Sequence, residues 1–429
     1  MIRKIPITIF IFILFFSCKK DNNVGYPTVS ILAPAALTTF NVFDTVTIKA
    51  SASDASKLQS VQVYVINSQN TPVLPSYSVP ITGSSMTFSV PYILNNIHLA
   101  SGTYNIVVDA YNGTNDTKAY RQIYIDAVPT VREAVYAITR NHSGIHLWKL
   151  DSLFNVTLSA TQGGDYSSSD ISAYYQQLYI SAADSGNVTA YAVPVGSQIW
   201  TVPGIISSTP YFTNVYAYGD AVYASYYNDY VKYYNNAGAI QSNTATATGY
   251  YPIKTCIWSN YLFVEEKYIS STIRNLVLFY AATGGAYQQS NLPGPVVAMY
   301  GMDYNDVFVF GNTNSGTGYL QQYNISGNLF YSPVVMPSAK ILSVAQIDTQ
   351  TYLVGFDNGS IYLYTYNPNS IAPYINGITA SHLQYDVANN MIIASSGTSV
   401  YEYNYSTLGL VHTANLGDSV LNVHVLYNH

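Results

Sequence analysis

A two-strand pattern of apolar and polar positions recurs seven times between Val135 and Tyr403. The first strand of each copy carries a pair of apolar or aromatic residues, and the second carries an aliphatic residue followed three positions later by an aromatic one. The pairs are Val135-Tyr136, Leu178-Tyr179, Val222-Tyr223, Leu262-Phe263, Val307-Phe308, Tyr352-Leu353 and Ile392-Ile393, and the second-strand residues are Ile145/Trp148, Val188/Tyr191, Val231/Tyr234, Val277/Tyr280, Leu320/Tyr323, Ile361/Tyr364 and Val400/Tyr403. Successive copies are about 40 to 45 residues apart, the period of a four-stranded propeller blade. The pattern predicts a seven-bladed β-propeller over residues 134–429.

The two ends of this region predict how the ring closes. The hairpin Ala134–Leu150 has no inner strand before it, whereas residues 419–427 supply one strand more than the last blade needs. If this surplus strand pairs with Ala134–Arg140, it completes the first blade and leaves no open sheet edge. We therefore expect a propeller closed by the C-terminal strand, with Val423 near Tyr136.

Residues 27–127 carry strand-like runs of another kind, separated by turn residues. We expect strands at Thr28–Leu32, Val46–Ala52, Ser60–Ile66, Ser76–Ile81, Met86–Val90, Tyr104–Ala110 and Ala119–Ile125, an arrangement typical of a sandwich. The segment 101–106 resembles the tyrosine corner of immunoglobulin-like domains, with Tyr104 as the tyrosine and Ile106 in place of the second core Cys. The resemblance implies a disulfide-free, Ig-like β-sandwich. The whole chain is thus expected to be all-β.

The first residues resemble an export signal. Arg3 and Lys4 precede an apolar run, Ile5–Phe16, that is shorter than the roughly 20 residues of a spanning helix. The junction 15–18 resembles the lipobox of bacterial lipoproteins, which implies a signal peptide over residues 1–17, a lipid anchor on Cys18 and a polar tether over residues 18–26. Phe15 stands where that box usually has Leu, so an ordinary secretory signal is the alternative. An outer-membrane lipoprotein of the cell envelope is expected, with the periplasmic and surface-exposed orientations both open.

The amino-acid composition limits the classes of molecule that the protein is expected to bind. Only 9% of the residues are charged, and the formal net charge is −6. Nucleic acid is not expected as a partner, because its binding depends on basic residues that neutralise phosphates. Membrane contact is expected through the lipid only. With Cys18 lipidated, Cys256 has no disulfide partner and is expected to be a small buried hydrophobe.

Several blades resemble the repeats of quinoprotein-type propellers. The matching segments are 185–191 with 199–204, and more loosely 357–364 and 400–405 with 410–413. Enzymes of that family hold a quinone with a calcium ion, acidic ligands and often two adjacent cysteines. None of these features is recognisable here, so the resemblance implies blade structure, and we expect no cofactor.

The sequence shows no recognisable set of catalytic or metal-ligating residues. His142 and His146 flank a turn without an evident third ligand, and zinc needs three or four. Glu265, Glu266 and Lys267 are expected at a solvated loop tip. Shared acid/base work by the two carboxylates is not expected, because adjacent residues of an extended strand point to opposite sides. Dispersed residues could still assemble a hydrolase triad, so the sequence favours a binding protein without settling whether the chain is an enzyme.

A ligand is expected on one face of the ring. Loops between the second and third strands of a blade lie on the same face as the loops that join blades, and tyrosines there offer a flat apolar surface with a hydroxyl group. Each tyrosine has the alternative role of filling a strand. The expected ligand-binding residues are Arg140, His142, Tyr166, Tyr211, Tyr226, Tyr227, Asp229, Glu265, Tyr268 and Asp357.

Together these features predict a lipid-anchored binding or adhesion protein. The sandwich would act as a spacer, and the propeller would present its face to a protein or glycan ligand. A monomer is expected. The alternatives are a periplasm-facing scaffold for envelope assembly and a propeller enzyme that acts on polysaccharide.

Overall fold

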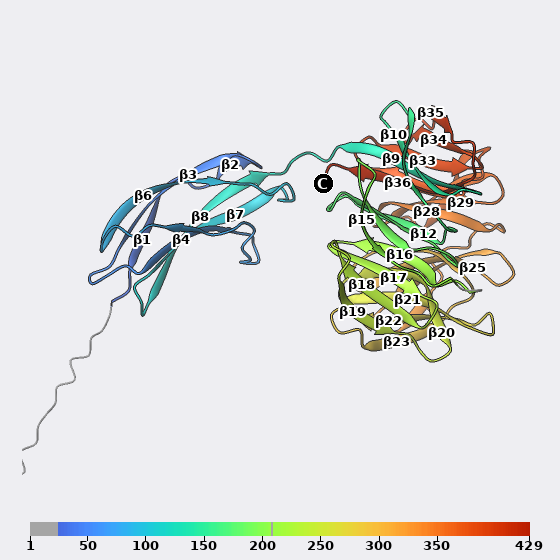
Figure 1. Ribbon diagram of the computed structural model, residues 1–429, viewed down its shortest axis with the longest axis horizontal. Coiled ribbons are helices and arrows are strands. Elements are labelled where there is room, and N and C mark those ends of the chain that lie inside the picture. The colour runs from blue at the N-terminus through green and yellow to red at the C-terminus, as the bar shows by residue number, and fades with distance from the viewer. Residues whose placement is uncertain (1–24, 207–208) are drawn as a thin grey trace, which may run out of the picture. The chain divides into compact units, whose positions relative to one another are not determined.

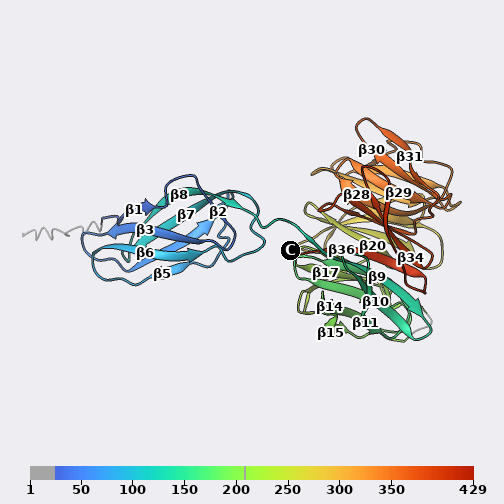
Figure 2. The ribbon, with the colours of Figure 1, turned by 90° about the horizontal axis from the view of Figure 1, so that it is seen from above.

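The computed structural model describes residues 25–206 and 209–429. The chain divides into two compact units, one that ends at Pro129 and one that begins at Thr130 (Figure 1, Figure 2). Throughout the described residues the regular structure is β-strand, which confirms the all-β prediction. The predicted signal peptide and Cys18 lie outside these residues. In the described part of the chain, no helix is long and apolar enough to cross a membrane.

The first unit is a sandwich of two sheets. One sheet has the order β1 (Thr28–Ala33), β3 (Thr45–Ser53), β6 (Ser85–Ile93), and the other has the order β2 (Thr38–Asn41), β8 (Asp116–Asp126), β7 (Gly102–Tyr111), β4 (Ser60–Ile66), β5 (Tyr77–Val79). Alternate residues of the central strands are buried between the sheets, among them Ile48, Val63 and Ile106. All seven predicted strands are present. The tyrosine corner is also confirmed, because the hydroxyl of Tyr104 donates a hydrogen bond to the Ala100 carbonyl at 2.9 Å.

The second unit consists of seven four-stranded antiparallel sheets, which confirms the predicted number of blades. Blade 1 has the order β36 (Val420–Tyr427), β9 (Arg132–Asn141), β10 (Gly144–Leu150), β11 (Val156–Gln162) from the channel outward. Blades 2 to 7 are β12 (Ser168–Ser172), β13 (Gln177–Ser181), β14 (Val188–Ala192), β15 (Ser197–Val202); β16 (Phe212–Tyr218), β17 (Ala221–Tyr226), β18 (Tyr230–Asn235), β19 (Ile240–Ala245); β20 (Tyr250–Trp258), β21 (Tyr261–Tyr268), β22 (Arg274–Tyr280), β23 (Ala286–Asn291); β24 (Val296–Gly301), β25 (Asp306–Asn312), β26 (Gly318–Asn324), β27 (Leu329–Tyr331); β28 (Ile341–Asp348), β29 (Thr351–Phe356), β30 (Ser360–Thr365), β31 (Ser370–Asn376); and β32 (His382–Asp386), β33 (Met391–Ser396), β34 (Ser399–Asn404), β35 (Leu410–Asn415).

The ring closes as the sequence predicts. Strand β36 pairs antiparallel with β9, so that Val423 lies opposite Ala137 and His424 lies opposite Tyr136. The amide of Val131 also donates to Asn428 Oδ1 at 2.9 Å. The last strand of the chain therefore supplies the inner strand of the first blade.

The second strand of each blade explains the repeated apolar pair. These strands pack between two neighbouring blades, so both of their faces are buried. In blade 4, for example, Leu262 and Val264 pack toward blade 3, whereas Phe263 packs with Val307 of blade 5. Continuous burial of this kind produces an apolar run instead of alternation.

A buried ion cluster reinforces the seam between blades 1 and 7. Arg132 Nη1 lies 3.0 Å from Asp386 Oδ2 and also contacts Glu402 Oε1. The other Glu402 oxygen is 2.6 Å from His412 Nδ1. The side chains of Asp386 and Glu402 are 0% and 2% exposed, so Arg132 neutralises two carboxylates that have almost no contact with water.

Candidate binding site in the central channel

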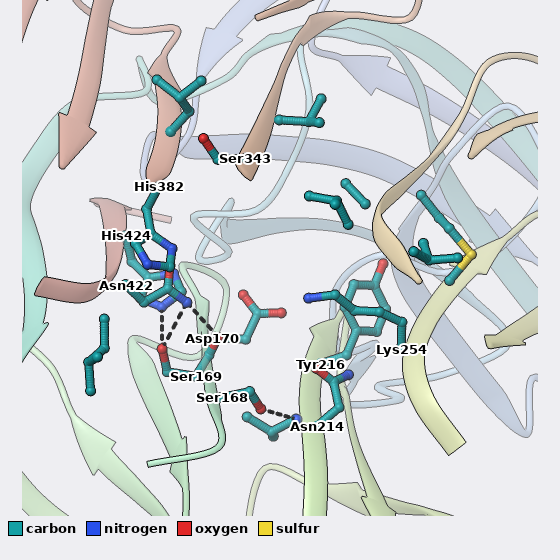
Figure 3. A pocket seen from close by; sticks show the side chains of 18 of the residues that line it. Ser168, Ser169, Asp170, Asn214, Tyr216, Lys254, Ser343, His382, Asn422 and His424 are labelled. Atoms are coloured by element: carbon teal, nitrogen blue, oxygen red, sulfur yellow. Dashed lines mark hydrogen bonds between the residues drawn. The ribbon is translucent and has the colours of Figure 1, made fainter. Parts of the chain in front are cut away.

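The seven inner strands, β36, β12, β16, β20, β24, β28 and β32, enclose a cavity of about 470 Å³ (Figure 3). Most of the lining residues come from the first part of each inner strand. The cavity therefore lies toward the face of the ring where the chain enters each blade. This is also the face that carries the loops between second and third strands, and we call it the loop face.

Backbone bulges direct polar side chains into this cavity. Five inner strands shift register with their second strand close to their start, at positions 212/214, 252/254, 296/298, 341/343 and 420/422. A bulge inserts one unpaired residue and changes the direction in which the neighbouring side chain points. Asn214, Lys254, Ser343 and Asn422 each follow a bulge, and each lines the cavity.

Two opposite charges point toward each other in the cavity (Figure 3). The Asp170 carboxylate accepts hydrogen bonds from the amides of Ala217 and Ile171, both at 2.8 Å. Burial raises the pKa of Asp170 to about 6, although these amides and the charge of Lys254 oppose the rise. Burial lowers the pKa of Lys254, and the charges of Glu265 and Asp170 oppose that change. The ion pairs of the described residues do not include Asp170 with Lys254, so a polar ligand group could interact with both.

A second polar group in the cavity centres on Ser169. Its Oγ lies 2.8 Å from His424 Nε2 and 2.9 Å from the Tyr166 hydroxyl, and it accepts a hydrogen bond from Asn422 Nδ2 at 3.1 Å. Burial lowers the pKa of His424 to about 3 and that of His382 to about 4. Both imidazoles are therefore neutral at pH 7.

The Ser169–His424 contact is the geometry of a nucleophile with its base, but its electrostatics favour hydrogen bonding over proton transfer. An efficient general base has a pKa near the working pH and is oriented by a third group, usually a carboxylate. The pKa of His424 is far below 7, and its largest charge interaction is with His382. The hydrogen bonds and ion pairs of the described residues do not join His424 to a carboxylate. The cluster is therefore suited to binding a polar ligand.

The predicted ligand-binding residues occupy several places on the loop face. Tyr166 lines the central cavity. Arg140 and His142 lie beside a separate cavity of about 490 Å³, together with Gly417 and Asp418. These residues do not form one site with the channel.

The other predicted residues make local contacts. The ring of Tyr227 lies 4.4 Å from that of Tyr251, and the ring of Tyr268 lies 5.0 Å from that of Tyr250. Tyr211 packs edge-to-face on Phe212, and Asp357 accepts the Lys340 amide at 2.9 Å. Asp229 lies in the β17–β18 turn with a φ of 75°. A role for these residues in ligand binding stays a prediction.

Two of the predicted residues are not accessible to a ligand. Tyr226 is 1% exposed, and its hydroxyl contacts that of Tyr234. Glu265 is fully buried, pairs with Arg274 and accepts the Val296 amide at 3.2 Å.

The prediction of a solvated tip at 265–267 is wrong for the two glutamates. Strand β21 continues to Tyr268, so Glu265 and Glu266 lie inside the strand. Their side chains point into the blade interfaces on its two sides.

Sequence reasoning missed Ser169, Asp170, Lys254, His382 and His424 as site residues. Their only signal is a polar side chain on an inner strand, and this signal is readable only after each inner strand and its bulge have been located. Cys256 is buried as predicted, and burial raises the pKa of its thiol to about 12. Within residues 25–206 and 209–429, no group of three or more His, Cys, Asp or Glu side chains could hold a metal ion.

The likeness to known proteins follows the two folds. Residues 27–108 match the family model described as Bacterial Ig domain. No curated protein matches the sequence. A solved structure of a quinonprotein alcohol dehydrogenase-like protein from Bacteroides thetaiotaomicron has a TM-score of 0.50 and 11% identity, over 94% of this chain and 99% of that one. The WD40 β-propeller domain of Doa1 also has a TM-score of 0.50, with 12% identity over 62% of this chain and 88% of its own.

At these identities the structural likeness shows the fold alone. The predicted Ig-like domain and quinoprotein-like propeller are confirmed as folds. A bacterial Ig domain is typical of extracellular or envelope proteins.

Proposed function

We propose that this chain is a lipid-anchored binding protein of the bacterial cell envelope, and that its propeller takes part of a glycan into the central channel from the loop face. The observation that carries the proposal is the polar lining of the channel. It combines the acid Asp170, the base Lys254 and neutral hydrogen-bonding groups such as Ser169, His382, Asn422 and His424.

The chemistry of the lining favours a sugar. Ligand cavities usually measure about 300–1,000 Å³, and the channel falls within this range. Sugars present many hydroxyl groups that both donate and accept hydrogen bonds. Ser169, Asn422 and the neutral His382 and His424 can do the same, while Asp170 accepts and Lys254 donates.

The envelope location has two supports. The lipobox-like segment ending at Cys18 would place a lipid at the start of the mature chain, and the Ig-like domain stands between this segment and the propeller. Such an order suits a protein that holds a recognition domain away from a membrane.

A glycan array with the mature protein, followed by calorimetry on each hit, tests the ligand. We expect Asp170→Asn and Lys254→Met to weaken binding at least tenfold without lowering the melting temperature. Asp220→Asn, at an exposed position in the β16–β17 turn and outside the channel lining, is the control and should bind as the wild type does. Failure to bind any glycan, or wild-type affinity in both channel variants, would contradict the proposal.

Mass spectrometry of the N-terminal peptide tests the anchor. We expect a lipidated Cys18, and loss of the lipid in Cys18→Ser. Protease treatment of intact cells then separates the two orientations, because a periplasm-facing scaffold would be protected. An N-terminal peptide that retains residues 1–17 would refute the anchor.

A further inference from the structure

The interface between blades 3 and 4 is apolar over most of its length and polar at the loop-face end. Four rows of alternate residues face one another there: Ala221, Tyr223 and Ser225 on β17; Asp229, Val231 and Tyr233 in the turn and on β18; Leu262, Val264 and Glu266 on β21; and Asn275, Val277 and Phe279 on β22. Their apolar members pack as one cluster. At the loop-face end, every row finishes with an oxygen-bearing side chain. Strands β17, β18, β21 and β22 are seen together in Figure 1.

Those four terminal side chains have buried oxygens without partners. Ser225 and Glu266 are fully buried, and Asn275 is 2% exposed. Five oxygens have no hydrogen-bond partner: Ser225 Oγ, Asp229 Oδ1, Glu266 Oε1 and Oε2, and Asn275 Oδ1. Glu266 and Asn275 are direct cross-strand partners, so their side chains share one face of the sheet.

Among the described residues, no positive charge acts on Glu266 or pairs with Asp229. The charge that acts on Glu266 is that of Asp229, a second carboxylate, which raises its pKa further beyond the larger effect of burial. The backbone amide of Ala247 is near enough to lower this pKa, but it makes no hydrogen bond of standard geometry with either Glu266 oxygen. The nearest basic residue in sequence, Lys267, has its ammonium 5.9 Å from the ring centre of Tyr251. Neither carboxylate belongs to an ion pair among those of the described residues.

Such a group is costly to bury unless something outside the chain completes it. An unpaired buried carboxylate is strongly unfavourable, and one facing a second carboxylate is more so. Acceptors without donors attract a cation. Oxygen-only donors suit Ca²⁺, which takes six to eight oxygens in flexible geometry, whereas Zn²⁺ prefers nitrogen and sulfur, and Mg²⁺ keeps several waters in a strict octahedron.

We propose that Ser225, Asp229, Glu266 and Asn275 form a Ca²⁺ site between blades 3 and 4. The two carboxylates balance the charge of the ion, and Glu266 can bind it through both oxygens. Remaining positions would be filled by backbone carbonyls of the adjoining loops or by water. The ion would join the Asp229 turn of blade 3 to two strands of blade 4.

Metal-stripped full-length protein titrated with Ca²⁺ tests the site by calorimetry and thermal unfolding. We expect one ion per chain and a melting temperature that rises with Ca²⁺ and falls again with chelator. Asp229→Asn should weaken binding at least tenfold while preserving the fold, because Asn also adopts the positive φ of this turn. Glu266→Gln should do the same. Asp116→Asn, in the Ig-like domain where Asp116 pairs with Lys118, is the matched control and should bind as the wild type does.

Three results would overturn the proposal. The first is the absence of any Ca²⁺-dependent shift at millimolar concentrations. The second is undiminished binding in both Asp229→Asn and Glu266→Gln. The third is a crystal structure grown in Ca²⁺ in which only hydrogen-bonded water lies among the five oxygens.

Discussion

Two blade interfaces that each hold a pair of carboxylates handle this negative charge in different ways. At the seam between blades 1 and 7, two buried carboxylates, Asp386 and Glu402, lie on either side of Arg132. Between blades 3 and 4, Asp229 and Glu266 lie together without a cation from the chain. At the seam, the two ends of the ring are joined by noncovalent contacts only, and the side chain of Arg132 supplies the positive charge. The interface inside the ring can depend on an ion from solution, because the chain already connects its two blades.

Removal of residues 419–429 tests the seam most severely. It takes away β36, including the buried Val423 and Leu426, and exposes the edge of β9. Each buried aliphatic side chain contributes roughly 1.5–3 kcal/mol as an upper estimate, while a whole domain has a net stability of only about 5–15 kcal/mol. We expect an insoluble or unfolded propeller by circular dichroism and gel filtration. A soluble truncated protein with the melting temperature of the full chain would contradict the closure.

Arg132→Met tests the built-in cation. It leaves Asp386 without a cation and Glu402 with His412 as its remaining partner, so we expect a loss of about 3–5 kcal/mol in the free energy of unfolding. Urea denaturation of the propeller measures it. Arg140→Met, at an exposed position on the same strand, is the control, with an expected change within about 0.5 kcal/mol. Equal effects of the two changes would show that the seam cluster adds no stability.

A matched pair of Glu→Gln changes sharpens the comparison. In chelator, Glu402→Gln should destabilise the protein because Arg132 loses a charged partner. Glu266→Gln should stabilise it by about 2 kcal/mol, because burial and Asp229 both disfavour the charged form, whose pKa is raised to about 7. Thermal unfolding at pH 8, compared with the wild type, shows whether each change stabilises or destabilises the protein. Destabilisation of the chelated protein by Glu266→Gln would show that this carboxylate already has a favourable partner.

Acid should weaken the seam through His424 on β36. Its folded-state pKa of about 3 lies below the unfolded value of about 6.5, so the unfolded chain takes up the proton first. Stability is therefore lost as pH falls below about 6.5. His382 acts in the same direction, whereas Asp170, with its pKa raised to about 6, partly offsets the loss.

The His424→Gln variant isolates this contribution. Between pH 7 and pH 4.5, we expect wild type to lose about 1–2 kcal/mol more than the variant in urea denaturation. Parallel pH profiles of the two proteins would mean that His424 is already charged or solvated in the fold.

The strands that could be predicted from the sequence are those buried on both faces, because their residues form continuous apolar runs. Second strands such as β17 are buried on both faces, so their apolar pairs are visible without knowledge of their neighbours. The strand count predicted the closure, because the first hairpin lacked an inner strand and the end of the chain supplied one strand too many. Strand β2 was missed because its four residues, Thr38–Asn41, are exposed or half-buried and show no apolar alternation.

The channel site and the blade 3–4 oxygens were hidden for a different reason. A register shift after Val420 places Leu421 in the channel wall, although simple alternation along β36 would put it on one face with Val423 and Val425. A bulge depends on the partner strand, and the sequence of one strand does not reveal it. Likewise, Glu265 and Glu266 look like a loop tip until the length of β21 is known.

Blade 1 combines strands from the beginning and the end of the propeller sequence, and this sets an order of events during synthesis. Val131 and Asn428, which are hydrogen-bonded in the folded protein, are 297 residues apart in sequence. The ring cannot close until β36 has left the ribosome. The nascent chain therefore cannot complete the propeller before that point. In the envelope location that we propose, this delay suits export, because a translocation pore admits an extended chain and excludes a completed ring.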